Sequence, residues 1–232
     1  MSKPVDLAYF SDILCVWAYA SQIRLDELKN NLGDKVRVHQ HFISVFGCTE
    51  QRIGEGWADR GGYSGFSENV CQVGRQFPHI RVNPDIWSRC RPKTSCTSHI
   101  FLKSAQLLEE RRLVSADLDP LYNRTPVEEL IWRVRRAFFE EARDVGRFSV
   151  LYGLAEQLKF PISDLEALIN DGSALAALQR DMELKEMQKL EGSPSYLLND
   201  GRQKLYGNVG YRVIEANVVE LFEHPEVQAS WC

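Results

Sequence analysis

Cys15 is the residue in this sequence with the clearest potential for chemistry. A short apolar strand is predicted over Val5 to Phe10, and a helix is predicted to begin at or just after the cysteine. A thiol at a helix N-terminus lies at the positive end of the helix dipole and beside backbone N–H groups that lack partners. Such a position favours the thiolate, and it can lower the pKa of a cysteine from about 8.5 to between about 3.5 and 7.5. We therefore expect a reactive thiolate at Cys15.

The residues that follow Cys15 supply half of a dithiol motif. A C-x-x-C spacing indicates a redox pair, but here the fourth position of C-V-W-A is Ala18. In a dithiol enzyme the second cysteine attacks the mixed disulfide and releases the substrate. A mixed disulfide on Cys15 must instead be cleared by an external thiol or by another cysteine brought close. Cys48 and Cys96 are the candidates for that second role.

The six cysteines of the chain are expected to be mostly free thiols, as in a reducing cytosol. Cys90 and Cys96 are close enough in sequence for a local disulfide, which their geometry would decide. Cys232 is terminal and is expected to be exposed. No cysteine has the paired C-x-x-C spacing of a zinc site, so we predict no metal site.

The composition is that of an ordinary globular protein. The chain has 232 residues, 44% of them hydrophobic, so it can bury a large core. Its net charge of −4 gives no general attraction to nucleic acid or to an anionic membrane. The first residues lack the apolar stretch of a signal peptide, and no apolar run approaches the roughly 18 residues of a membrane span. We expect a cytoplasmic protein.

The predicted elements on either side of Cys15 form a β-α-β unit. A helix is predicted over Trp17 to Asn31, where apolar residues recur at helical spacing, and it ends near Gly33. A second strand is predicted over Val36 to Val45, because the segment alternates and is rich in β-branched residues. Two strands joined by one helix favour a right-handed crossover and a parallel pair.

The middle of the chain is predicted to be helical after one loop. The glycine-rich segment Gly47 to Gly65 has no clear period, so we predict a loop with the composition of a lid. Thr125 is expected to cap one of the helices that follow, and Ser163 another. These helices are predicted over Phe66–Gln76, Thr97–Arg111, Pro126–Phe139, Phe148–Leu158, Asp164–Asn170 and Ser173–Lys189.

The end of the chain returns to strands. Ser195 to Asn199 is a short apolar strand, and the Asp-Gly sequence within Asn199 to Arg202 favours a hairpin turn. Gln203 to Tyr206 is the antiparallel return strand, and a helix over Gly210 to Phe222 follows. The predicted order is therefore β-α-β, a helical block, and β-β-α.

This order, with a thiol at the first strand-to-helix turn, is the thioredoxin arrangement, and four segments resemble one family that has it. The segment F-S-D-I-L-C-V-W-A-Y (10–19) is similar to the family's F-x-D-x-x-C-P-W-C-Y. R-P-K-T-S-C-T-S-H (91–99) and G-S-P-S-Y (192–196) resemble its P-N-[ST]-x-x-A-H and G-[VS]-P-[TS]-[FY] motifs, and Y-G-N-V (206–209) resembles the glycine segment before its last helix. The family is that of the DsbA-like thioredoxin-fold oxidoreductases. Within it the chain is most similar to FrnE-like proteins and to their relatives, 2-hydroxychromene-2-carboxylate isomerase and kappa-class glutathione transferase.

The resemblance implies an α/β protein with a thioredoxin fold (β-α-β and β-β-α) and a large all-helical insertion. Residues 1–46 and 190–232 would form the thioredoxin-like domain, and residues 47–189 the loop and the helical insertion. In this superfamily the proline that corresponds to Pro194 is cis, and it turns the backbone of the preceding residue towards the thiol loop. Ser193 would then pair its backbone with a cysteinyl peptide such as glutathione.

The resemblance also assigns candidate site residues. Cys15 is the catalytic residue, and Ser193 and Pro194 align the substrate. Trp17 is a candidate for an apolar rim that selects the substrate, or else it packs the first helix. His99 is a candidate for contact with the thiol or substrate, because its segment lies over the active site in the family, or else it braces its own helix.

Several residues differ from those of the family, and these differences limit the reactions that the site can perform. Val16 replaces a proline, and Ala18 replaces the resolving cysteine. The isomerase and transferase relatives have a serine where Cys15 stands, and a Ser-Asp pair that holds the γ-glutamyl group of glutathione. Asn208 and Val209 stand in place of that pair, so Asn208 remains the only polar candidate there and the acidic contact is missing.

Several further polar residues are weaker candidates. Lys93 and Thr94 are polar candidates for the wall over the thiol. A group of arginines beside Trp132 is flanked by glutamates at helical spacing, which favours a solvated, ion-paired face over an anion-binding patch. These arginines are Arg133, Arg135 and Arg136.

Three functions fit these features, because a fold resemblance alone does not fix a function. The first is a thiol-disulfide oxidoreductase that acts through Cys15 alone, by a mixed disulfide with glutathione or a protein thiol. The second is a glutathione-dependent transferase or isomerase, with Cys15 beside the glutathione sulfur and an apolar co-substrate against the helical block. The third is a non-catalytic thioredoxin-fold binding protein. We expect no tightly bound cofactor, no nucleic-acid or membrane partner, and a homodimer as in the relatives.

Overall fold

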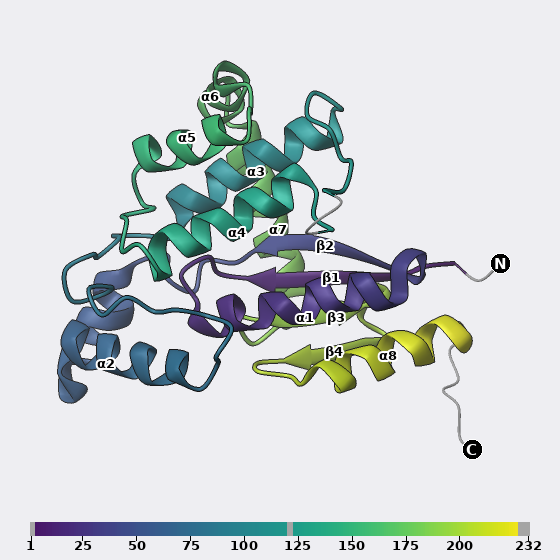
Figure 1. Cartoon of the computed structure of the whole chain (residues 1–232), viewed down its shortest axis with the longest axis horizontal. Coiled ribbons are helices and arrows are strands. Elements are labelled where there is room, and N and C mark those ends of the chain that lie inside the picture. Colours follow the sequence, from purple (N-terminus) through teal and green to yellow (C-terminus); the bar gives the residue numbers. More distant parts are fainter. Residues whose placement is uncertain (1–2, 120–122, 227–232) are drawn as a thin grey trace.

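Four strands form one mixed sheet. The computed structural model describes residues 3–119 and 123–226 (Figure 1). Within these residues the strand order is β2-β1-β3-β4. β1 and β2 are parallel, whereas β3 is antiparallel to both β1 and β4. The strands are β1 (Val5–Ser11), β2 (Val36–Phe42), β3 (Ser195–Leu198) and β4 (Gln203–Tyr206).

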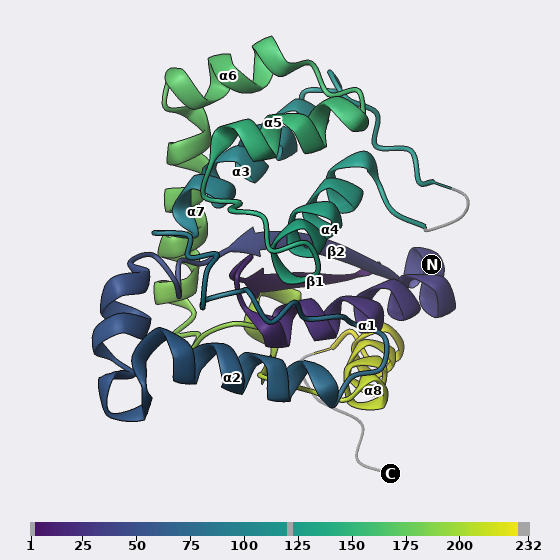
Figure 2. The same ribbon diagram turned by 60° about the vertical axis from the view of Figure 1, so that its left-hand side comes forward.

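Helices flank this sheet in two groups. The helices of the described residues are α1 (Val16–Leu32), α2 (Gly62–Arg75), α3 (Cys96–Glu110), α4 (Pro126–Phe139), α5 (Phe148–Gln157), α6 (Ile162–Asn170), α7 (Ser173–Met187) and α8 (Tyr211–Glu223). Figures 1 and 2 show α3, α4, α5 and α6 gathered beyond the edge strand β2, whereas α1 and α8 cover one face of the sheet and α7 lies on the opposite face. The insertion between β2 and β3 therefore builds a helical layer next to the end of β1 that carries the cysteine turn.

The apolar residues of β1 are buried on both faces of the sheet from Tyr9 onward, whereas Asp6 and Ala8 are half-buried. Val5, Leu7 and Tyr9 face α1 and α8 in one apolar cluster. Phe10 faces the opposite side, where α7 contributes Met182. The largest cluster joins the turn before α1 to α2, α3, α4 and α5, so the site region and the insertion share one core.

The predicted thioredoxin fold with a helical insertion is confirmed. The order β-α-β, helices, β-β-α is the observed order, and the first two strands are parallel. The predicted cap of α4 is also present. The Thr125 side chain accepts from the backbone N–H of Glu128, and the Glu128 carboxylate accepts from the N–H of Thr125. This capping box needs only local residues, so sequence pattern alone identifies it.

Three local predictions are wrong. β2 ends at Phe42 and not at Val45, because the next residues turn and the Phe46 N–H donates to the side chain of Asp12. The predicted loop from Gly47 to Gly65 contains a π-helical turn (Glu50–Glu55) and a 3₁₀ turn, and α2 begins within it at Gly62. Ser163 lies inside α6, whose N-cap is Pro161, so it is not the cap.

The predicted domain boundaries, at residue 46 and residue 190, stay a prediction.

The helices of the described ranges offer no candidate membrane span, since none is both long enough and apolar enough to cross a bilayer.

Candidate active site around Cys15

Cys15 is the N-cap residue of α1. It has extended backbone dihedrals, its N–H donates to the Asp12 carbonyl (3.1 Å), and its carbonyl accepts from Tyr19 N–H (3.0 Å). The first turn of α1 contains no acidic side chain. The thiol therefore lies at the open end of a helix, as the sequence predicts.

Burial makes the resting thiol less acidic than expected. Cys15 is only 6% exposed, and its Sγ donates to the Ser193 carbonyl at 3.4 Å. Desolvation raises the pKa of Cys15 above its ordinary value, and the Asp12 carboxylate acts in the same direction. Hydrogen bonds from Ser193 and from the backbone of Ala18 and Trp17 act in the opposite direction but do not outweigh burial. The expected lowered pKa is thus wrong for this geometry, and Cys15 is a neutral thiol at rest.

The loop before β3 faces the thiol. The Ser193–Pro194 peptide bond is cis. The Ser193 carbonyl accepts from the Cys15 thiol, and the Ser193 hydroxyl accepts from the backbone N–H of Asp12 at 2.9 Å. Pro194 is followed by β3, and its carbonyl accepts from Gly207 N–H. The structure therefore brings Cys15, Ser193 and Pro194 together.

Asp12 ties the cysteine turn to two distant segments, a role that the sequence did not indicate. The carboxylate is fully buried. It accepts from Leu14 N–H (2.9 Å), from Phe46 N–H (2.8 Å) and from the Ser95 hydroxyl (2.8 Å). It therefore joins the turn at Cys15 to the segment after β2 and to the start of α3. A lone acid between apolar residues is the only sequence signal for such a role.

His99 binds the backbone of the turn before Cys15 and does not line the cavity. It is fully buried on α3, its Nε2 accepts from Ile13 N–H (3.1 Å), and its ring stacks on Phe42 (5.2 Å between centroids). His99 is fully buried and is not among the residues that line the cavity, so the structure does not place it in the position of its predicted contact with substrate. Its Nδ1 has no hydrogen-bond partner. Lys93 and Thr94 are also absent from the cavity walls, and Thr94 Oγ1 instead accepts from Cys96 N–H.

His99 should make stability fall at acid pH. Burial lowers the pKa of His99 below its ordinary value, against the opposing effect of the Asp12 and Asp181 carboxylates and with the help of Arg135 and Lys103. Below about pH 6.5 the unfolded chain therefore binds more protons, and the free energy of unfolding should fall by up to about 1.4 kcal/mol per pH unit.

Urea unfolding at pH 7.5 and pH 5.5 checks this expectation. His99→Gln keeps an acceptor for Ile13 N–H but cannot be protonated, so its stability should depend less on pH than that of the parent. His224→Gln, at an exposed position, is the control. Equal pH dependence in all three proteins would contradict this role for His99.

A cavity of about 510 Å³ opens at Cys15. Four aromatic side chains line this cavity: Trp17, Phe46, Trp57 and Phe66. Charged and polar side chains also line the cavity, from the turn after β2, the π-helical turn Glu50–Glu55, α2, α7 and the segment before Ser193. They are Ser44, Arg52, Asn69, Lys185 and Glu191.

Trp17 is positioned for both of its predicted roles, and its selection of substrate stays a prediction, whereas Asn208 is not positioned for its own role. Trp17 lines the cavity next to Cys15, and its ring meets Phe77 edge to face at 6.1 Å. Asn208 is exposed and does not line the cavity, whereas the nearby Tyr206 does. Trp57, held under the Arg60 guanidinium at 3.9 Å, comes from the segment predicted as a loop.

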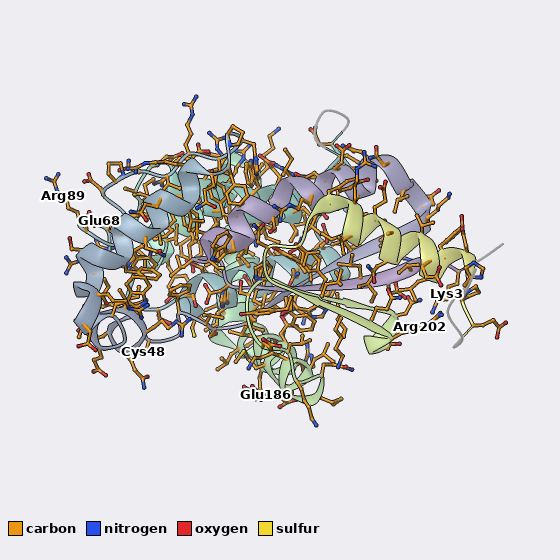
Figure 3. The ribbon with its side chains drawn as sticks, turned by 90° about the horizontal axis from the view of Figure 1, so that it is seen from below. Lys3, Cys48, Glu68, Arg89, Glu186 and Arg202 are labelled. Atoms are coloured by element: carbon orange, nitrogen blue, oxygen red, sulfur yellow. The ribbon has the colours of Figure 1, made fainter. Side chains whose placement is uncertain are left out.

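No disulfide links the cysteines of residues 3–119 and 123–226. The local bridge considered for Cys90 and Cys96 is not formed; burial raises the pKa of Cys90 to about 11. Cys96 Sγ donates to Ser44 Oγ (3.2 Å), and Ser44 lines the cavity, so Cys96 lies near the site. Cys48 is exposed, and Figure 3 shows it at the periphery. Cys232 lies outside the described residues.

The arginines beside Trp132 do not form one solvated face. Arg133 and Arg136 do pair with Glu129 and Glu140 one turn away, each at 2.9 Å. Arg135 is different, because its side chain is fully buried. The predicted ion-paired surface is therefore correct for two of the three arginines and wrong for Arg135.

No protein-family model and no curated protein sequence matches this chain. Similar solved structures include a probable DsbA oxidoreductase from Streptomyces coelicolor (TM-score 0.69, 17% identity, covering 95% of this chain and 91% of that chain). The cytosolic disulfide reductase DsbM from Pseudomonas aeruginosa with GSH is also similar (TM-score 0.61, 17% identity, 95% and 98% covered). So is a 2-hydroxychromene-2-carboxylate isomerase (TM-score 0.60, 13% identity, 93% and 95% covered). At these identities the likeness establishes a shared fold, the DsbA-like thioredoxin fold.

Proposed function

We propose that this chain is a thiol-disulfide oxidoreductase that uses glutathione and acts through Cys15 alone. One observation carries the proposal: of the cysteines in the described ranges, only Cys15 lines the cavity, with its Sγ against the Ser193 carbonyl. A single thiol beside a backbone carbonyl suits a mixed disulfide with a small cysteinyl peptide, in which Ser193 aligns the backbone of the peptide.

The charges of the cavity support glutathione as that peptide. Glutathione carries two carboxylates and one ammonium group, and the cavity presents Arg52 and Lys185 together with Glu191. Charge-assisted hydrogen bonds between such groups are the stronger class of polar contact. The structure of DsbM with GSH has the same fold, which is consistent with this assignment.

The reaction proceeds by two thiol-disulfide exchanges. Cys15 loses its proton to solvent, and its thiolate attacks the glutathione sulfur of a mixed disulfide between glutathione and a substrate thiol. The old S–S bond breaks, the substrate leaves as a thiolate that takes up a proton, and a Cys15–glutathione disulfide forms. A second glutathione thiolate then attacks the glutathione sulfur of that disulfide. Cys15 is released, and oxidised glutathione forms, so reduced glutathione is the electron donor.

Intact mass measurement after incubation with oxidised glutathione tests the proposal. We expect one glutathionyl adduct per chain, mapped by peptide analysis to Cys15 and removed by an excess of reduced glutathione. Modification of Cys48 alone, which is the exposed thiol within the described residues, would contradict the proposal. So would an unmodified Cys15 that iodoacetamide still alkylates.

The aromatic side chains of the cavity favour one alternative, a glutathione-dependent transferase or isomerase. Trp17, Trp57 and Phe66 can hold an apolar co-substrate beside the thiol. The 2-hydroxychromene-2-carboxylate isomerase shares the fold. Conjugation or isomerisation of an aromatic electrophile that survives Cys15→Ser would favour this alternative, because a hydroxyl can assist a bound glutathione thiolate but cannot form a disulfide.

The proposed chemistry fits a reducing compartment. Cys15, Cys48, Cys71, Cys90 and Cys96 are all free thiols, and reduced glutathione is abundant in the cytoplasm. We therefore propose a cytoplasmic location and a thiol- or disulfide-bearing partner.

A further inference from the structure

Arg135 is a buried cation without a carboxylate partner. Its side chain is fully buried in α4. Its Nη2 donates to Ser11 Oγ at 2.9 Å, its Nη1 donates to Gln22 Oε1, and its Nε has no partner. Both acceptors are neutral, and Arg135 forms an ion pair with none of the described carboxylates. Burying a charged group costs free energy unless an opposite charge or hydrogen bonds compensate for its lost hydration.

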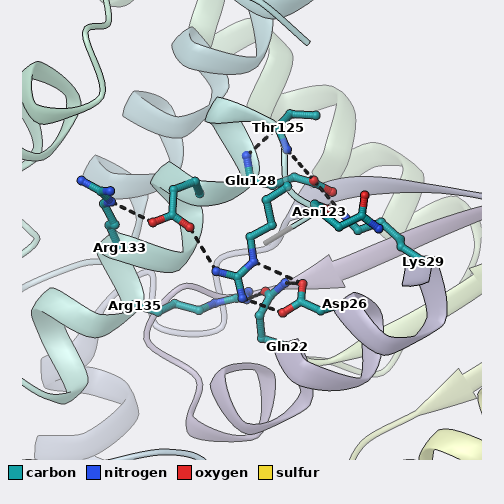
Figure 4. A network of polar contacts seen from close by, with 10 residues as sticks. Gln22, Asp26, Lys29, Asn123, Thr125, Glu128, Arg133 and Arg135 are labelled. Atoms are coloured by element: carbon teal, nitrogen blue, oxygen red, sulfur yellow. Dashed lines mark hydrogen bonds and ion pairs between the residues drawn. The ribbon is translucent and has the colours of Figure 1, made fainter. Parts of the chain in front are cut away.

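The carboxylates of the polar network around Arg135 are already paired with other cations (Figure 4). Asp26 accepts two hydrogen bonds from Arg124, the shorter at 2.6 Å. Glu129 accepts from Arg124 and also pairs with Arg133. The remaining acid of this network, Glu128, pairs with Lys29 at 2.6 Å. The network thus holds four cations and three carboxylates, and Arg135 is the cation left over.

The acceptors of Arg135 place its charge next to the cysteine turn. Ser11 ends β1 and is followed by the Asp12 turn, and Gln22 lies on α1 two turns beyond its N-cap, Cys15. The titratable groups that face Arg135 from β1, α1, α3, β3 and the segment before α4 are Tyr9, Cys15, Asp26, His99, Tyr196 and Arg124.

Among these groups Cys15 is the one that must gain a negative charge in the proposed reaction. Burial raises the pKa of Tyr9 and Tyr196 and lowers the pKa of His99, so these three stay neutral. Asp26 already has Arg124. A Cys15 thiolate raises the pKa of Arg135, and by reciprocity the Arg135 charge favours the thiolate.

We propose that Arg135 is a positioning residue for Cys15: its unneutralised guanidinium stabilises the thiolate that forms during exchange and holds the Ser11 end of the turn. The role rests on the proposed function, in which Cys15 must become a thiolate. The charge of Arg135 acts in the direction opposite to burial and to the Asp12 carboxylate, both of which raise the pKa of Cys15.

Alkylation of Cys15 by iodoacetamide, followed by peptide mass analysis from pH 6 to 10, tests this role. Arg135→Met keeps most of the side-chain volume and removes the charge. The pH midpoint for Cys15 alkylation should rise by about one unit, so the rate at pH 7 should fall about tenfold. Arg136→Met, which removes a neighbouring exposed charge from the same helix, should leave the profile unchanged.

Gln22→Glu separates the charge of Arg135 from its structural contacts. The substitution keeps the hydrogen bond to Arg135 and places a carboxylate against it, so the positive charge is cancelled. It also replaces the amide that donates to Asp26 Oδ1 at 3.2 Å, so a loss of stability in urea is expected and is measured alongside. The Cys15 midpoint should still rise in the same direction as in Arg135→Met. This second variant keeps the test decisive if Arg135→Met fails to fold.

An unchanged midpoint in Gln22→Glu, in a folded protein, would overturn the role. A midpoint that rises in both Gln22→Glu and Arg136→Met would overturn it as well, because the effect would then be a general one of net charge. The alkylation readout needs no glutathione. A wild-type protein that forms no glutathione adduct therefore refutes the proposed function, while the shift in midpoint still decides the role of Arg135.

Discussion

Cys15→Ser should abolish glutathionylation in the cavity and reduce disulfide exchange by on the order of 10³-fold or more. A serine hydroxyl is not a nucleophile towards disulfides at neutral pH, and no other described cysteine lines the cavity. Turnover of a small mixed disulfide by reduced glutathione, coupled to detection of oxidised glutathione, measures the loss. The fold should be retained, because serine can keep the hydrogen bond to the Ser193 carbonyl.

Cys71→Ser is the matched control for this experiment, since it makes the same chemical change at a half-buried thiol of α2 that does not line the cavity. It should leave turnover unchanged. Exchange activity that persists in Cys15→Ser but is lost in Cys96→Ser would contradict the assignment and move the chemistry to the thiol that donates to Ser44.

The part of the site that the sequence predicts is the part built from neighbouring residues. The strand, turn and helix around Cys15 follow from local apolar patterns, and the Thr125 cap follows from four consecutive residues. The pairing of Ser193 with the thiol spans 178 residues. It was inferred from a resemblance between motifs and not from the local pattern. Local structure is thus predictable here because each residue is judged against residues within one or two turns.

The acidity of Cys15 shows why the remainder was not predictable. The position of the thiol at a helix end is a local property, but its desolvation depends on Ser193 and on the packed segments that leave it 6% exposed. Burial is a long-range property, and here it outweighs the effect of the helix end. The same reasoning applies to His99, whose partners are Ile13 and Phe42, more than fifty residues away.

Arg135 carries two conflicting sequence signals, the charges beside it and the apolar residues at helical spacing from it. The glutamates at helical spacing predicted a solvated face for the whole arginine group. Yet Arg135 lies four residues after Ile131 and three before Phe138, on the apolar face of α4 that is buried in the core. When an arginine lies on the apolar face of an amphipathic helix, the position on that face predicts its burial better than the neighbouring charges do.

Asp12→Ala should destabilise the fold by about 3–5 kcal/mol, the second large effect that the structure predicts. The substitution removes a fully buried acceptor from Leu14 N–H, Phe46 N–H and the Ser95 hydroxyl at once. Each buried donor left without a partner costs about 1–3 kcal/mol. Chemical denaturation followed by tryptophan fluorescence measures the change, and alkylation of Cys15 reports whether the turn has moved.

Asp12→Asn is the informative companion to this variant. An amide keeps one acceptor oxygen of the right size, but its NH₂ group must face either Leu14 N–H or the pair formed by Phe46 N–H and the Ser95 hydroxyl. It should therefore cost less than alanine, about 1–3 kcal/mol. The amide also removes the negative charge that raises the pKa of Cys15, so alkylation at pH 7 should become faster in Asp12→Asn while stability falls. Slower alkylation of a folded Asp12→Asn would mean that Asp12 acts on Cys15 through the shape of the turn rather than through its charge.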